Sequence, residues 1–235
     1  MLPAAPPLVL WDIDHTLVSI SGVGREIYQR VFEQVTGRPL VHLADMAGRT
    51  EQAILRETLR LNGVEPGDSF DVFYAALEEV ARSLEGRMRE NGRVLPGVRE
   101  ALAAFKSDGA VQSLVTGNIP ALAAMKLEAF GLEGFIDFEV GGYGDDGSDR
   151  AILVRLAIER AEAKYGHGFK AEHAVVIGDT AHDVRGALDN GAMAVGVATG
   201  FTDTATLIAS GAHVVLSDLR DLTALHTAVL ARRAA

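Results

Sequence analysis

Residues 8–18, LVLWDIDHTLV, combine an apolar strand with two carboxylates at its end. The first four residues are typical of a strand that is buried on both faces of a sheet. Asp12 and Asp14 follow directly, although a buried carboxylate is costly unless it is paired or binds a metal. A functional role for the two aspartates would explain their position.

The composition favours a globular enzyme-sized domain. The chain has 235 residues, of which 48% are hydrophobic and 23% charged, which suits one large domain or a core with an insertion. The formal net charge is −10 and no Lys/Arg cluster is present, so nucleic acid is not expected as a partner. A phosphate-bearing substrate must therefore be attracted locally, by a metal or by placed hydrogen-bond donors.

Cysteine is absent from the chain, which excludes disulfides, thiol nucleophiles and cysteine-ligated zinc. The first residues, MLPAAPPLVLWD, lack the basic region of a signal peptide. No segment offers about 18 uninterrupted apolar residues, so no membrane span is expected. These features predict a soluble cytoplasmic protein without a membrane partner, and they leave its oligomeric state open.

From Pro96 onward, short apolar runs alternate with longer amphipathic segments. Strands are predicted at 110–118, 135–142, 173–179 and 193–200, and helices at 98–109, 119–134, 149–166 and 181–191. This alternation indicates βαβ units, and hence an α/β fold with a Rossmann-like parallel sheet. Ligands of such sheets bind beyond the carboxyl ends of the strands.

The segment before Pro96 has a different pattern. Residues 24–37, 48–63 and 69–90 are helical in period, with no convincing strand among them. We therefore predict a helical cap at 18–91, inserted after the first strand of a core made of 1–17 and 92–235. Phe70, Phe73 and Tyr74 are expected to pack between cap helices.

Polar residues follow the apolar strand runs of the predicted core. They are Asp12 and Asp14, then Thr116, Gly117 and Asn118, then Arg150 near a helix start, and finally Asp179 and Asp183. Carboxylates that converge on one point need a cation, because like charges repel at close range. Oxygen ligands without Cys or a His pair favour Mg²⁺. A metal, acidic groups and a hydroxyl beside glycine describe a phosphoryl-transfer site.

Three of these motifs resemble those of the haloacid dehalogenase-like (HAD) hydrolases. DIDHTL at 12–17 matches their DxDxT/V motif, LVTGN at 114–118 their second motif, and VVIGDTAHD at 175–183 their fourth. The helical insertion lies where the family's first type of cap occurs. The phosphoglycolate phosphatase and β-phosphoglucomutase branch is the most similar.

The resemblance implies roles for the aspartates. Asp12 would be the nucleophile that forms an aspartyl-phosphate, and Asp14 would protonate the leaving oxygen and then activate water. Mg²⁺ would be bound by the side chains of Asp12 and Asp179 and by the backbone carbonyl of Asp14. Asp183 would act from behind them or through a metal-bound water.

The resemblance also implies groups that hold the phosphate. Thr116 and the amides of Gly117 and Asn118 would bind the phosphoryl oxygens. A cation of the third motif would neutralise charge that develops in the transition state. The usual Lys-Pro of that motif is missing, so Arg150 is the predicted substitute and Arg155 the weaker candidate.

Three further residues near these motifs are not assigned a step in the chemistry. His15 stands where glycine is usual and concerns the geometry of the turn. In the cap, MAGRTEQ at 46–52 resembles a substrate-specificity loop, so Arg49 is a candidate for binding the far end of the substrate. The alternative is that this segment is only a helix start at a glycine turn, capped by Thr50. His182 either belongs to the site or faces solvent.

The predicted function is a Mg²⁺-dependent phosphatase acting on a small phosphorylated metabolite, similar to phosphoglycolate phosphatase. Asp14 argues against the dehalogenase branch, and the lack of lysine before Lys106 argues against a Schiff base in the cap. A sugar-phosphate mutase of the β-phosphoglucomutase type is the alternative. A non-catalytic binding protein on this fold is a further one, although the nucleophile and metal aspartates are all present.

Overall fold

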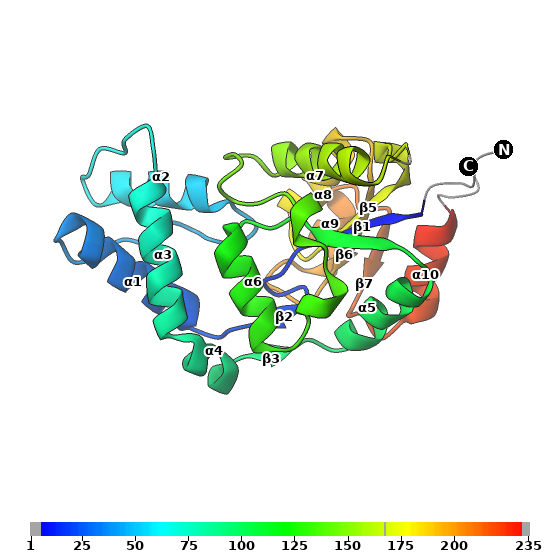
Figure 1. The fold of residues 1–235 in the computed structure, drawn as a ribbon, viewed down its shortest axis with the longest axis horizontal. Coiled ribbons are helices and arrows are strands. Elements are labelled where there is room, and N and C mark those ends of the chain that lie inside the picture. Colours follow the sequence, from blue (N-terminus) through cyan, green and yellow to red (C-terminus); the bar gives the residue numbers. More distant parts are fainter. Residues whose placement is uncertain (1–5, 167, 232–235) are drawn as a thin grey trace.

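The computed structural model describes residues 6–166 and 168–231. Its centre is a five-stranded parallel sheet with the strand order β4-β1-β5-β6-β7 (Figure 1). The strands are β1 (Leu8–Trp11), β4 (Val111–Leu114), β5 (Ala174–Gly178), β6 (Met193–Val197) and β7 (Val214–Leu216). The prediction of an α/β fold with a parallel sheet is confirmed.

Helices cover both faces of the sheet, and β1 shows why. Val9 and Trp11 point into one core with residues of α5 (Val98–Ser107), α6 (Pro120–Ala129) and α10 (Leu222–Ala231). Leu8 and Leu10 point into the opposite core with residues of α7 (Arg150–Tyr165), α8 (Ala181–Asp189) and α9 (Thr204–Ala209). Successive strand side chains alternate between faces, so a strand buried on both faces is apolar throughout.

A helical segment lies beside the sheet, on the left of Figure 1. It contains α1 (Val23–Thr36), α2 (Glu51–Leu61), α3 (Asp71–Ser83) and α4 (Glu85–Asn91). The short strands β2 (Val18–Ser19) and β3 (Arg93–Val94) pair antiparallel at its two ends. Phe70 is buried in the core of this segment, and Phe73 and Tyr74 pack against it, as expected.

Helix α6 connects the helical segment with the sheet. Its residues Leu122 and Met125 are buried in the core of the segment, whereas Ala123 and Leu127 are buried in the core beneath the sheet. The helix is therefore apolar on two sides and fixes the segment against the carboxyl edge of the sheet.

The strand predicted at 135–142 is wrong. Two 3₁₀-helices occupy this region, η1 (Glu133–Phe135) and η2 (Phe138–Val140), and only Gly142 bridges to Val115. The Asp137 side chain accepts a hydrogen bond from Glu139 N and so caps η2. Such local side-chain bonds compete with a strand ladder, which explains why an apolar run here does not add a strand.

No helix in the described part of the chain is long and apolar enough to cross a membrane.

Candidate active site

The site lies at the carboxyl edge of three neighbouring strands. Asp12 follows β1, Thr116 follows β4 after one residue, and Asp179 follows β5. Because β1 lies between β4 and β5, the sheet itself brings these residues together. Asp12 N donates to Ile177 O at 2.9 Å, so the ladder between β1 and β5 continues up to the first aspartate.

The chain turns sharply after Asp12. Ile13 O accepts hydrogen bonds from the backbone N–H groups of Leu17 at 2.9 Å and Val18 at 3.0 Å. His15 has a φ of 63°, and no other non-glycine residue among those described has a positive φ. This is the left-handed region that glycine favours and that histidine tolerates better than most residues. The glycine-to-histidine departure therefore concerns the turn, as expected.

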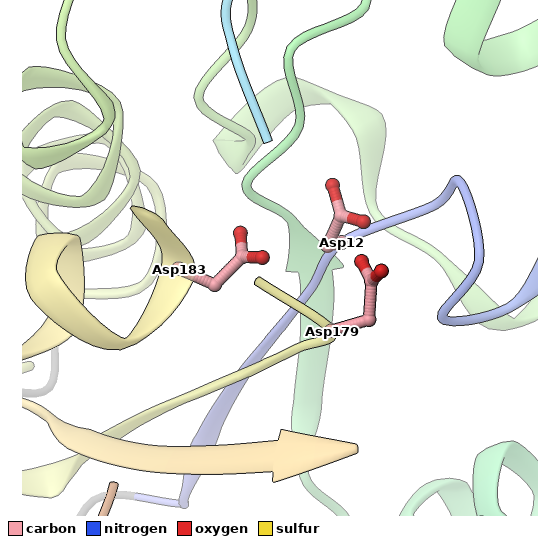
Figure 2. A group of neighbouring side chains, drawn as sticks. All are labelled: Asp12, Asp179 and Asp183. Carbon is pink, nitrogen blue, oxygen red and sulfur yellow. The ribbon is translucent and has the colours of Figure 1, made fainter. Parts of the chain in front are cut away.

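Three carboxylates converge above the edge of the sheet. Asp12, Asp179 and Asp183 are 4%, 3% and 1% exposed. Each offers one oxygen, and these oxygens all lie within 4.8 Å of one another (Figure 2). The Thr16 hydroxyl lies 3.4 Å from Asp12 Oδ2 and 3.5 Å from Asp179 Oδ1, so it ties two of the three together.

Arg150 is the only Lys or Arg that the structure pairs with this cluster in the described chain. Its Nη2 lies 3.0 Å from Asp12 Oδ1 and 2.8 Å from Asp183 Oδ1, while Nη1 donates to Val115 O at 3.3 Å. The residue begins α7, and Asp149 caps that helix through Ala151 N. Arg155, the weaker candidate, is exposed and pairs with Glu159 instead.

The cluster lacks positive charge. Burial and then the charge of Asp183 raise the pKa of Asp12 well above its usual range, although Arg150 acts in the opposite direction. Burial, again followed by Asp183, also raises the pKa of Asp179. One guanidinium thus compensates three carboxylates incompletely. The donor set consists only of hard oxygens, which fits a divalent cation such as Mg²⁺.

Asp183 has a structural role besides its charge. It forms a capping box with Thr180 at the start of α8, in which Oδ2 accepts from Thr180 N at 3.1 Å and from Thr180 Oγ1 at 2.6 Å. Its Oδ1 is the oxygen that pairs with Arg150. One oxygen of Asp183 therefore caps α8, while the other belongs to the acidic cluster. The neighbouring His182 is exposed on the first turn of α8 and does not line the cavity described below.

The Asp14 carboxylate is not part of the group of three carboxylates and is bound by residues of α6 and of the turn after β4. It accepts hydrogen bonds from Lys126 Nζ at 2.6 and 2.8 Å and from Asn118 Nδ2 at 2.8 Å. Burial alone would raise the pKa of Asp14, but the Lys126 charge and hydrogen bonds outweigh burial and hold the pKa below its usual value. Whether the Asp14 backbone carbonyl binds a metal stays a prediction.

Lys126 was missed by the sequence analysis. It is buried, and its third hydrogen bond goes to Asn118 Oδ1 at 2.7 Å. The available signal was a single lysine within the apolar run of residues 119–127, since a buried lysine almost always has a partner.

The Thr116-Gly117-Asn118 turn lies between the sheet edge and the helical segment. Thr116 Oγ1 accepts from Asn118 N at 3.3 Å, and Gly117 O accepts from Glu51 N, at the start of α2, at 2.8 Å. A Cβ at Gly117 would lie 2.0 Å from Arg49 O. Glycine is therefore required for the helical segment to approach this turn.

A cavity of about 520 Å³ lies between the helical segment and the sheet edge. Most of the predicted site residues line it: Asp12, Asp14, Arg49, Gly117, Asn118, Arg150 and Asp179. Thr116 and Asp183 do not line the cavity and lie behind it. The structure thus brings the predicted residues to one place, and their chemical roles stay predictions.

Arg49 lines the cavity, but its guanidinium is bound within the helical segment. It pairs with Glu57 and donates to Asp45 O at 3.3 Å and Ala53 O at 3.4 Å. The prediction that Arg49 contacts substrate is untested, and in this structure its guanidinium is already paired with Glu57.

Glu51 and Tyr28 form a polar pair in the cavity wall that the sequence did not suggest. Both are buried, and the Tyr28 hydroxyl donates to Glu51 Oε2. Burial raises the pKa of Glu51 to about 7, although the hydrogen bond from Tyr28 and the charge of Lys126 act to lower it.

The family model of the haloacid dehalogenase-like hydrolases matches residues 9–187. A phosphoglycolate phosphatase of Agrobacterium fabrum is 26% identical over 223 residues, which cover 92% of this chain and 91% of that protein. A phosphoglycolate phosphatase of Pseudomonas putida is 24% identical over 223 residues, covering 92% and 78%. The crystal structure of a hydrolase from Pseudomonas syringae has a TM-score of 0.68 at 21% identity and covers 93% of this chain and 96% of that one.

Replacing Arg150 should destabilise the metal-free protein. Arg150→Met leaves the three carboxylates without a cation, and we expect a loss of about 3–5 kcal/mol in the free energy of unfolding. Added Mg²⁺ should recover part of this loss, because a bound divalent ion replaces the missing charge. Thermal unfolding with Mg²⁺ and with chelator measures both effects. The exposed Arg155→Met is the control; equal losses from the two variants would contradict the assignment.

Glu51→Gln should change how stability depends on pH. The native carboxyl holds its proton more tightly than the unfolded one, so the wild type loses stability as the pH rises from about 4.5 to above 7. Glu51→Gln has no carboxyl group there and lacks this loss. Its free energy of unfolding relative to the wild type should therefore rise by about 1–3 kcal/mol over this pH range. Urea unfolding at several pH values measures the difference. The other titratable groups of the site are present in both proteins and largely cancel in the comparison. If the difference in stability between variant and wild type did not change with pH, the raised pKa of Glu51 would be contradicted.

Proposed function

Since the chain belongs to the haloacid dehalogenase-like hydrolases, we propose that it is a Mg²⁺-dependent phosphatase of a small phosphorylated metabolite. The observation that carries the proposal is the group of buried carboxylates of Asp12, Asp179 and Asp183 around one arginine at the carboxyl edge of the sheet. The relatives named phosphoglycolate phosphatase support the reaction class. The absence of cysteine fits a reducing compartment such as the cytoplasm.

Asp12 is the proposed nucleophile. Arg150 and Thr16 bind its two oxygens and so fix the carboxylate at the floor of the cavity. A carboxylate oxygen attacks phosphorus, the bond to the leaving oxygen breaks, and an aspartyl-phosphate forms on Asp12. Water then attacks the phosphorus of this intermediate and releases inorganic phosphate.

Asp14 is the proposed acid and base. It protonates the leaving oxygen in the first step and takes a proton from the attacking water in the second. Its hydrogen bonds from Lys126 and Asn118 fix the carboxylate beside the cavity. Lys126 favours the ionised form, which is the form that the second step requires.

Asp12 and Asp179, with the backbone carbonyl of Asp14, would hold Mg²⁺, and Asp183 would support them from behind. When bound, the ion supplies positive charge beside the phosphoryl oxygens. Thr116 and the backbone amides of Gly117 and Asn118 would bind the phosphoryl oxygens, and the Asn118 amide would then exchange its present acceptor, Thr116 Oγ1, for the phosphate.

We propose that the helical segment, residues 18–91, is a cap that closes over the substrate. Two backbone hydrogen bonds support this, from Glu51 N to Gly117 O at 2.8 Å and from Gln52 N to Gly144 O at 3.1 Å. They hold the first turn of α2 against the loops that follow β4. Closure of this kind keeps bulk water away from the reacting phosphate.

Asp12→Asn should abolish turnover, because an amide cannot form the acyl phosphate. We expect phosphate release from a panel of phosphate esters to fall by about 1000-fold or more, with the far-ultraviolet circular dichroism unchanged. Asp68→Asn, an exposed aspartate of the helical segment, is the matched control. Normal release by the Asp12 variant, or full wild-type activity in excess chelator, would contradict the proposal.

Lys126→Gln should lower kcat more than it changes KM, because Lys126 positions Asp14 and does not itself contact the phosphate. We expect kcat to fall by about 10- to 100-fold. Lys106→Gln, an exposed lysine that donates to Gly134 O, is the control. Unchanged kcat, or an increase in KM alone, would exclude the positioning role.

The mutase alternative is decided by the products of the same panel. A sugar-phosphate mutase uses the same aspartyl-phosphate but returns the phosphoryl group to the sugar. Isomerised sugar phosphate with little free phosphate would therefore replace the phosphatase proposal by the mutase one.

A further inference from the structure

The cavity above Asp12 is larger and less polar than a two-carbon acid requires. Its volume of about 520 Å³ lies within the range of about 300–1,000 Å³ that is typical of pockets for larger ligands. The wall formed by the helical segment and α6 is mainly apolar, with Ile20, Ile27, Leu43, Ile54, Leu77 and Leu122. The alcohol part of the substrate, once the phosphate lies on Asp12, faces this wall.

Among the described residues, no cation that lines the cavity is both buried and unpaired, so none is free to bind a carboxylate on the substrate. Four Lys or Arg side chains line it within the described chain. Lys126 is bound to Asp14 and Asn118, and Arg150 is bound between Asp12 and Asp183. Arg49 is bound to Glu57 and two backbone carbonyls, and Arg25 is exposed.

The buried Glu51 carboxylate lies on the same wall. It lines the same cavity as Asp14 and Lys126, the two residues proposed to act on the leaving oxygen. A second carboxylate there would meet a like charge, whereas an O–H or N–H group would find an acceptor.

Glu51 is not needed to cap α2. Thr50 already caps that helix by accepting a hydrogen bond from Ala53 N at 3.2 Å. A first-turn glutamate that only complements the helix dipole gains the same effect at the surface, without the cost of burial. The burial of Glu51 beside the cavity therefore calls for a further reason.

We propose that the substrate is a phosphate monoester of an uncharged or cationic alcohol, whose O–H or N–H donor binds Glu51 and whose apolar part packs on the cavity wall. This inference rests on the proposed phosphatase function, and it disfavours phosphoglycolate as the substrate. Tyr28 holds Glu51 in place and so acts as a positioning residue.

Matched short esters test the inference on the wild-type protein with Mg²⁺. Hydroxyethyl phosphate, aminoethyl phosphate, propyl phosphate and phosphoglycolate differ mainly in the group that reaches Glu51. At about pH 8, where Glu51 is ionised, we expect the better of the two donor esters to exceed phosphoglycolate by about tenfold or more in kcat/KM. The ratio of the amino to the hydroxy ester identifies which donor the site accepts.

Glu51→Gln separates recognition from a structural role. Glutamine can still accept from Tyr28 but carries no charge, so kcat/KM for phosphoglycolate should rise relative to the donor esters by about tenfold. A folding defect cannot produce such a gain. Tyr28→Phe should weaken the preference for the donor esters, and Glu78→Gln, an exposed change on α3, should leave the ranking intact.

The outcomes distinguish this inference from the proposed function. Phosphoglycolate as the best wild-type substrate, or an unchanged ranking in Glu51→Gln, would overturn the inference while the phosphatase assignment stands. No turnover of any ester, including an aryl phosphate, would overturn both.

Discussion

The main constraint on this site is electrostatic: three buried carboxylates are paired with a single arginine. Asp12 and Asp179 end adjacent strands, Asp183 lies in the first turn of α8, and Arg150 at the start of α7 is shared between two of them. Two adjacent strands and two helix starts thus bring these charged side chains together. Because the side chains are buried, water does not screen the repulsion between the carboxylates. In the function proposed above, a divalent cation would relieve the repulsion, and an incoming phosphate would in turn add negative charge beside that cation. The same electrostatic arrangement would therefore account for both the proposed metal and the proposed substrate class.

The leaving-group side of the site has a different origin. Asp14 is fixed by Lys126 of α6, a helix buried between the sheet and the helical segment. Glu51 and Tyr28 come from α2 and α1 of that segment. In the proposed function the phosphate end is built on the sheet, whereas the opposite end depends on helices as well, because Lys126 of α6 binds Asp14.

The sequence located the cavity residues that follow strands better than those that lie within helices. Strand ends can be located from apolar runs, so Asp12 and Asp179 could be assigned to one edge from the sequence. Arg150, at a helix start, was predicted only as the substitute for the missing lysine of the third motif. Lys126, Glu51 and Tyr28 lie within helices, and whether they face a cavity depends on how those helices pack. The sequence suggested Arg49 as a substrate contact, and the structure places it in the cavity wall. Its bonds to Glu57 and to the backbone depend on the loop conformation, which the sequence does not give. The strand expected at 135–142 failed because the Asp137 cap favours a 3₁₀-turn.

A crystal structure of the protein with Mg²⁺ and beryllium fluoride, a mimic of an acyl phosphate, tests most directly whether the carboxylates form a metal-dependent phosphoryl site. We expect beryllium on an oxygen of Asp12, and one Mg²⁺ bound by Asp12 and Asp179. An ion bound elsewhere, with Asp12 free of beryllium and still paired only with Arg150, would contradict the central claim.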